Sequence, residues 1–244
     1  MKTKILLILA ILAVQYGFSQ TQTLIPENKV MVTGAMRQVM WEGKLDAQIQ
    51  LDSLAGQKGL YGIGPLSGLQ GEILLQDGHC YVSKVSGPAE MRAFEDPKAG
   101  APFFVYAKVL AWEEFSVPDS IRNLEMLEIY LDELSLNRPR PFAFRLNGLA
   151  LEANIHIQNL PDGARVSSPE EAHAGQVNYH ITNEPVEITG FFSTEHKAVF
   201  THHDTFMHLH LITADKTKMG HLDALTPGSM KLYLPASSSL FPTE

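Results

Sequence analysis

Alternating hydrophobic and polar positions run through most of the chain after its first twenty residues and indicate a strand-rich protein. Two dipeptides, Asp77-Gly78 and Asn147-Gly148, each lie between two apolar segments. Both dipeptides tolerate the positive φ angles that a tight hairpin turn requires, so we predict a hairpin at each. The segment 177–234 has the same character and predicts further strands separated by turns.

Helical periodicity is confined to two segments. The clearer one follows Pro118-Asp119-Ser120, where apolar residues recur at helical spacing behind a capping residue, at Ile121, Leu124, Leu127, Leu131 and Leu134. Pro139 and Pro141 end this predicted helix, and a weaker helix is predicted over residues 44–55. Many strands with few helices predict an α+β protein dominated by antiparallel strands.

The first twenty residues have a different pattern. A basic start at residues 1–4 precedes an apolar run at residues 5–14, and small Gly17 and Ser19 favour cleavage after Ser19. The run is shorter than the roughly 20 residues that a membrane helix needs. We therefore predict a signal peptide over residues 1–19, a secreted or periplasmic location, and one domain over residues 20–244.

Composition and charge narrow the class of protein. The 244 residues include 19 Lys and Arg against 27 Asp and Glu, a net charge of −8, which argues against a nucleic-acid partner. With 45% hydrophobic residues the chain can form a core, and we expect no membrane span after residue 19. Cys80 is the only cysteine in the chain, so an internal disulfide is excluded.

The densest candidate chemistry is a group of histidines in the last third of the chain. Alternation over residues 206–212 places His208 and His210 on one face of a strand. A hairpin centred on Asp215-Lys216 then places His210 directly opposite His221, with Cβ atoms about 5 Å apart. Three neutral imidazoles and an open position are the ligand set of a catalytic Zn²⁺ or a similar divalent metal.

Other histidines compete for this role. His202, His203 and Asp204 lie nearby in the sequence, but consecutive residues of an extended segment point to opposite faces, so at most one of the two histidines can join. The remaining histidines lack partner spacing and are interpreted as surface or core residues; they are His79, His156, His173, His180 and His196.

An ordered set of short motifs resembles the α-acetolactate decarboxylase family, from about Thr33 to Leu234. The motifs are Tyr61-Gly62-Ile63-Gly64, Leu69-Gln70-Gly71-Glu72, Pro141-Phe142-Ala143-Phe144-Arg145-Leu146-Asn147-Gly148, His208-Leu209-His210 and Gly220-His221-Leu222-Asp223. The resemblance implies a β-rich α+β fold in two sheet-bearing halves, commonly dimeric. It also makes residues 20–244 an acetolactate decarboxylase-like domain.

The same resemblance implies a site and a reaction. A metal, usually zinc, would be held by His208, His210 and His221, with Glu72 and Arg145 beside it. The reaction would be decarboxylation of the small molecule 2-acetolactate to acetoin, with the enediolate stabilised by the metal and Arg145 and with Glu72 as general acid. The forked donors of Arg145 could bind either the substrate carboxylate or the developing oxyanion. Without the resemblance, Glu72 and Arg145 are ordinary surface or salt-bridged residues.

The chain departs from the family pattern at two places. Pro65 stands where a Thr is often found, and residues 236–239 lack the acidic residue that family members commonly carry close to the metal. Two alternatives therefore stay open. One is a catalytically degenerate, exported metal-binding homologue, and the other is a different metal-dependent enzyme such as a hydrolase.

Overall fold

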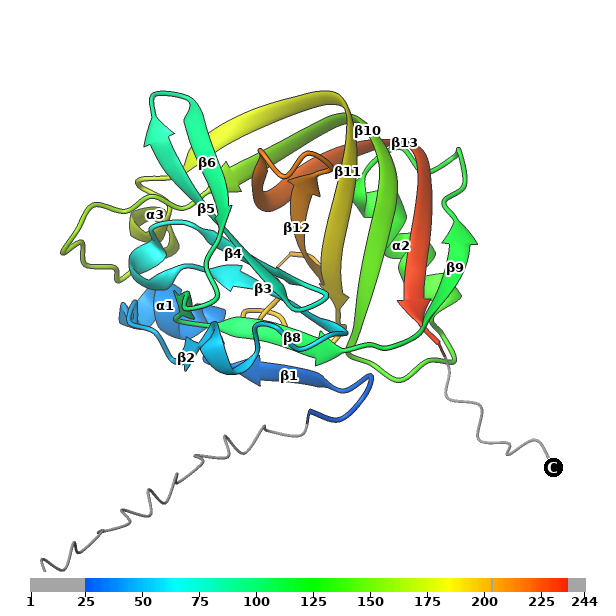
Figure 1. The fold of residues 1–244 in the computed structure, drawn as a ribbon, viewed down its shortest axis with the longest axis horizontal. Coiled ribbons are helices and arrows are strands. Elements are labelled where there is room, and N and C mark those ends of the chain that lie inside the picture. The colour runs from blue at the N-terminus through cyan, green and yellow to red at the C-terminus, as the bar shows by residue number, and fades with distance from the viewer. Residues whose placement is uncertain (1–24, 203, 237–244) are drawn as a thin grey trace, which may run out of the picture.

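Two antiparallel sheets make up most of the described chain. A computed structural model describes residues 25–202 and 204–236 (Figure 1). The first sheet has six strands in the order β1-β8-β3-β4-β5-β6. Its strands are β1 (Val30–Thr33), β3 (Leu60–Pro65), β4 (Glu72–Gln76), β5 (His79–Gly87), β6 (Glu90–Glu95) and β8 (Phe104–Lys108), and a small sheet pairs β2 (Ile49–Gln50) with β7 (Gly100–Ala101).

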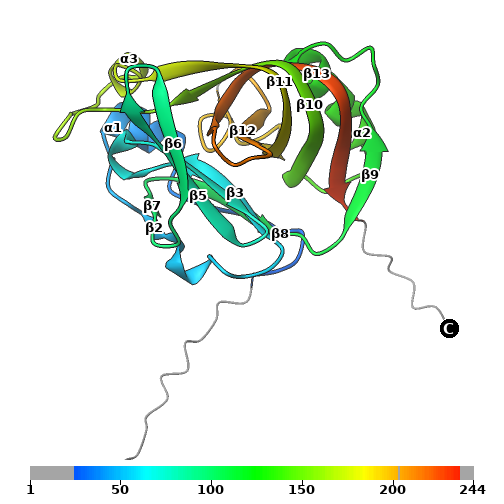
Figure 2. The same ribbon diagram turned by 45° about the horizontal axis from the view of Figure 1, so that its top comes forward.

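The second sheet has five strands in the order β10-β11-β12-β13-β9, and β10 also pairs with β13. Because of this extra pairing, the four strands β10, β11, β12 and β13 form a closed ring around an interior (Figure 2). Phe144, Leu146, Ile188 and Leu211 fill this interior. The strands are β9 (Trp112–Ser116), β10 (Phe142–Ile157), β11 (Val177–Phe192), β12 (Met207–Thr213) and β13 (Met219–Pro235). The prediction of a β-rich α+β fold with antiparallel sheets in two halves is confirmed.

The helices only partly follow the predictions. The helix expected after Pro118 is α2 (Leu124–Leu134), and it begins at Asn123, whose side chain accepts a hydrogen bond from the Met126 amide at 2.8 Å. Leu127 and Leu131 pack its apolar face on the second sheet. The helix ends at Leu134, so the predicted stops Pro139 and Pro141 lie beyond its end.

The helix predicted over residues 44–55 is wrong. This segment contains β2 and a 3-10 turn, η1 (Leu51–Ser53), while a helix, α1 (Met36–Glu42), lies just before it. Gly43 ends α1 in the left-handed conformation, with φ of 61°. The apolar residues after Gly43 therefore belong to a short strand and a turn, and not to a helix. A third helix is α3 (Pro169–Ala172).

The two predicted hairpins have opposite outcomes. Asp77-Gly78 joins β4 to β5 with both φ angles positive, 49° and 86°, which confirms the first. The second is wrong, because Asn147-Gly148 lies inside the continuous strand β10. A Cβ atom on Gly148 would lie 2.2 Å from the Ser229 carbonyl oxygen, so this glycine allows β13 to approach closely instead of forming a turn.

The candidate site lies where the two sheets pack together. Ile63 and Leu74 of the first sheet share one core cluster with Phe191 and Ile212 of the second. Side chains two residues apart on a strand share a face, so His210 also faces the first sheet. Among the described residues, none of the helices has the length and apolar character needed to cross a membrane. The predicted signal peptide, residues 1–19, lies outside the described residues.

Candidate metal centre

The β12–β13 hairpin brings together the three histidines predicted from the sequence. His210 pairs directly with His221, as the register arithmetic predicts. The three buried rings have centroids 5.2 Å (His208 to His210), 5.1 Å (His208 to His221) and 5.6 Å (His210 to His221) apart. Three imidazoles bound at about 2.0–2.1 Å to one ion place their centroids roughly 5 Å apart. The ring spacing is therefore compatible with one shared ion, while the described ligand atoms that all lie within 4.8 Å of one another belong to His156, His221 and Asp223.

The protonation and hydrogen bonding of these rings also fit a metal. Within the described residues, Nδ1 of His208 and Nε2 of His210 are buried without a hydrogen-bond partner, which is costly unless another ligand satisfies them. Burial, together with the neighbouring imidazoles, lowers the pKa of His208 and His210 well below the usual value and that of His221 to about 3. Neutral rings keep the lone pairs that a divalent cation requires.

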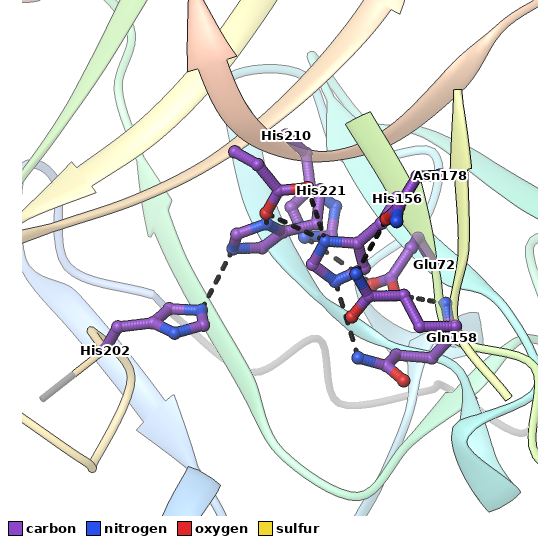
Figure 3. Close-up of polar contacts among 9 residues, drawn as sticks. Glu72, His156, Gln158, Asn178, His202, His210 and His221 are labelled. Atoms are coloured by element: carbon purple, nitrogen blue, oxygen red, sulfur yellow. Dashed lines mark hydrogen bonds and ion pairs between the residues drawn. The ribbon is translucent and has the colours of Figure 1, made fainter. Parts of the chain in front are cut away.

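Glu72, the first residue of β4, reaches this centre from the other sheet. Its side chain is buried, and Oε1 accepts a hydrogen bond from the backbone N–H of Gln158 at 3.0 Å. Oε2 lies 3.7 Å from Nε2 of His210 (Figure 3). Burial raises the pKa of Glu72 well above its usual value, against the Gln158 hydrogen bond that lowers it. The arrangement thus offers a carboxylic acid that can hold a proton next to the histidines.

A second group, which the sequence did not predict, adjoins the three histidines. The His156 ring stacks on His221 at 4.5 Å between centroids. Nδ1 of His156 donates to the Asp223 carboxylate at 2.8 Å, and Nδ1 of His221 does so at 3.1 Å. His156, His221 and Asp223 form a group that could itself hold a metal ion. Burial alone would raise the pKa of Asp223, but the hydrogen bonds from the two imidazoles hold it below its usual range.

Asp223 also decides which nitrogen of His221 faces the three-histidine centre. With Nδ1–H directed at the carboxylate, the lone pair of His221 is on Nε2. Nε2 of His202 lies 3.2 Å from that atom, so His202 is the competitor that joins the cluster. His203 lies outside the described residues.

The sequence carried a usable signal for only part of this second group. Asp223 follows His221 by two residues and therefore shares its strand face, a relation visible in the sequence. His156 is buried, as one of the two readings of the sequence expected, but its partners were missed, because β10 pairs with β13 and sets His156 directly opposite His221. That pairing joins distant segments, and no local pattern reveals it.

The contacts of Arg145 do not place it beside the histidines. It pairs with Thr189, which pairs with His210, so its backbone lies two strands, or about 10 Å, from His210. Its guanidinium carbon instead lies 5.2 Å from the centre of the Tyr61 ring, and Nη2 lies 3.5 Å from a carboxylate oxygen of Glu187. The rings of Trp112 and Tyr233 complete this aromatic surrounding.

A small pocket opens onto the centre. Its polar lining includes Glu72, Gln158 and the rings of His156, His202, His208 and His221, and its apolar lining includes Met36, Leu69 and Phe103. A buried acid, several imidazoles and one amide line this cavity, whose volume of about 20 Å³ has room for about one water-sized group. Arg145 is not part of this lining.

The fold and the site define a β-rich α+β protein with a histidine-lined candidate metal centre between its two sheets. Residues 33–240 match the model of the alpha-acetolactate decarboxylase family, and the chain belongs to this family of decarboxylases. The resemblance inferred from the motifs is thereby confirmed.

Solved structures agree with this assignment at the level of the fold. A crystal structure of acetolactate decarboxylase from Bacillus subtilis subspecies spizizenii matches with a TM-score of 0.72 and 18% identity, over 84% of this chain and 85% of that chain. A protein from Staphylococcus aureus, described as of unknown function and similar to alpha-acetolactate decarboxylase, matches with a TM-score of 0.70 and 16% identity, over 84% of each chain. No curated protein matches the sequence significantly.

Proposed function

We propose that the chain without residues 1–19 is an exported, metal-dependent decarboxylase that converts 2-acetolactate to acetoin. The observation that carries the proposal is the meeting of a buried acid, Glu72, with three neutral imidazoles, His208, His210 and His221, in a member of this family. These three histidines would hold Zn²⁺ or another divalent metal. The bound metal would supply a Lewis acid for the negative charge that develops on the substrate oxygens.

The reaction defines what the side chains must do. Loss of CO₂ from acetolactate leaves an electron pair that delocalises onto the ketone oxygen as an enediolate, and one proton must then reach carbon to give acetoin. Glu72 is suited to hold that proton, because its burial keeps the carboxylic acid form at higher pH than usual. The Gln158 amide, bonded to Oε1, fixes the orientation of the acid.

The substrate carboxylate also needs a partner in the pocket. Arg145 was expected in this role, but its guanidinium is engaged by Glu187 and three aromatic rings. Gln158 and His156 both line the pocket, with their Nε2 atoms 3.4 Å apart. We therefore assign the substrate carboxylate to the side-chain amide of Gln158, because Nε2 of a neutral His156 has no proton to donate, and a positioning role between the sheets to Arg145.

An acetoin assay on purified protein covering residues 20–244 tests the proposal. We expect acetoin from acetolactate, its loss after treatment with a chelator, and its return with one equivalent of Zn²⁺. The His180→Ala variant is a matched control, because His180 is exposed and bonds only Asn154 among the described residues. Stoichiometric metal without acetoin would favour the degenerate homologue, and turnover of esters or amides instead would favour a hydrolase.

Export and assembly are separate parts of the proposal. Mass spectrometry of protein recovered outside the cytoplasm should find residues 1–19 missing, and an intact Met1 terminus on that material would contradict the signal peptide. Light scattering on the same material should find a homodimer; a monomer with full activity would remove the dimer from the proposal.

A further inference from the structure

We propose that His202 is a fourth imidazole ligand of the ion held by His208, His210 and His221. The inference rests on the metal site of the proposed function but not on the decarboxylation itself. His202 lies in the connection between β11 and β12, and its ring centroid is 5.0 Å from that of His221 and 6.3 Å from that of His208. Figure 3 shows it approaching His221 from the side away from His156.

The contact between the two rings has the dimensions of a shared ion. Nε2 of His202 lies 3.2 Å from Nε2 of His221. Two nitrogens bound at about 2.0–2.1 Å to one tetrahedral ion lie roughly 3.3–3.4 Å apart. In the protein without metal, the same distance suits a hydrogen bond from His202 to His221. Both arrangements need a lone pair on Nε2 of His221, which the Asp223 contact at Nδ1 provides.

The position of His202 determines how a fourth ligand would affect access to the metal. His202 and His221 line both the inner pocket, of about 20 Å³, and a larger neighbouring hollow of about 310 Å³ that includes Glu128 and Asp204. His202 therefore lies at the boundary between the larger hollow and the centre. With four imidazole ligands, the site would have no open position for a substrate oxygen. His202 lies in a loop, whereas His208, His210 and His221 lie on paired strands, so His202 would be the ligand least constrained by its element.

Metal spectroscopy on the protein covering residues 20–244 tests this inference. With one equivalent of Co²⁺ or Zn²⁺, X-ray absorption should count four imidazoles in the unaltered protein and three in His202→Ala. The variant should also lose affinity for Zn²⁺ in chelator competition, by more than the about 10–100-fold that loss of an outer-shell partner costs. Circular dichroism of the metal-free variant checks its folding.

His173→Ala is the matched control, because His173 lines the same pocket while its Nδ1 bonds the Pro169 carbonyl oxygen at 2.6 Å. It should keep four imidazoles and the original affinity.

The outcomes separate this inference from the proposed function. Three imidazoles in the unaltered protein, or equal Zn²⁺ affinity in His202→Ala, would overturn the fourth ligand and leave the decarboxylase intact. Four imidazoles without acetoin formation would support the fourth ligand and overturn the decarboxylase. Absence of stoichiometric metal binding would overturn both. The imidazole count of the unaltered protein does not depend on how any variant folds.

Discussion

The Glu72 carboxyl group is buried in the protein. Burial disfavours its charged form and is the main reason that its pKa is raised. Glu72→Gln keeps the shape and an oxygen to accept from the Gln158 amide, but it has no acidic proton to give. We expect turnover of acetolactate to fall by about 10²–10⁴-fold, the usual contribution of a general acid, with metal content unchanged. Acetoin rates and elemental analysis measure the two, and a wild-type rate would remove Glu72 from the mechanism.

Asp223 acts on the metal centre through two rings at once. Its carboxylate accepts hydrogen bonds from Nδ1 of both His156 and His221, which fixes the ring orientation and leaves Nε2 of His221 free. Asp223→Asn should weaken Zn²⁺ binding by about 10–100-fold, because an amide cannot serve as acceptor to both rings equally. Chelator competition measures the affinity. Glu125→Gln, exposed on α2 beside the neighbouring hollow, should leave it unchanged.

Arg145 connects the two sheets, because Tyr61 belongs to the first sheet and Tyr233 to the second. Arg145→Met removes the charge and keeps most of the volume. We expect the free energy of unfolding to fall by about 1–3 kcal/mol, with metal affinity unchanged. Urea unfolding provides the measurement. Unchanged stability with a large rise in KM for acetolactate would instead return Arg145 to the substrate carboxylate.

The sequence predicted the members of the site whose relation is local. His208, His210 and His221 belong to one hairpin, so strand alternation and register were enough to bring them together. Glu72 was found only through the family resemblance, because a carboxylate at a strand start is ordinary. His156 was missed, since its place depends on a pairing between distant strands.

At the scale of elements, two similar glycine-containing dipeptides have different structural roles. Asp77-Gly78 turns the chain, whereas Asn147-Gly148 lies within β10, where Gly148 has φ of 154° and the ladder to β13 is irregular after it. A turn and a close strand crossing both require glycine. The choice between them depends on β13, which local sequence around Gly148 does not describe. This is why strand content could be predicted but not the closure of the second sheet.

Gly148→Ala tests this reading of β10. Its Cβ atom would lie 2.2 Å from the Ser229 backbone oxygen and 2.7 Å from Cα of Met230, so β13 would have to shift. We expect a loss of more than the about 1–2 kcal/mol that a left-handed backbone alone costs an alanine. Gly163→Ala is the matched control, because Gly163 has φ of 75° but open space around it. Urea unfolding compares the two, and equal losses would contradict the role of the close crossing.

At the scale of the whole molecule, the site belongs to neither sheet alone. Glu72 comes from the first sheet and the histidines come from the second, and the Gln158 amide that bonds Glu72 follows β10. Packing of Ile63 and Leu74 against Phe191 and Ile212 holds these groups together. Metal binding is therefore expected to favour the packed state of both sheets over their separation.

The metal-free protein should lose stability as pH falls, because the buried histidines resist protonation. The pKa of His221 is about 3 in the folded protein and near the ordinary 6.5 when unfolded, and those of His208 and His210 are lowered in the same direction. Between those values the unfolded chain binds more protons, so the free energy of unfolding falls as pH drops from about 6.5 towards 3. Burial also lowers the pKa of His202, so Glu72, whose raised pKa in the folded state has the opposite effect, is one group against four.

Urea unfolding in the presence of a chelator, at several pH values between 7.5 and 4.5, measures this dependence. His221→Gln removes one of the four titrating rings, so the stability of this variant should depend less steeply on pH than that of the unaltered protein. His180→Gln is the control, because His180 is exposed and bonds the uncharged side chain of Asn154, so its loss should leave the slope unchanged. A stability independent of pH below 6.5 would mean that the four rings are not held neutral. They would then be poorly prepared to bind a divalent cation, and the metal centre itself would be in question.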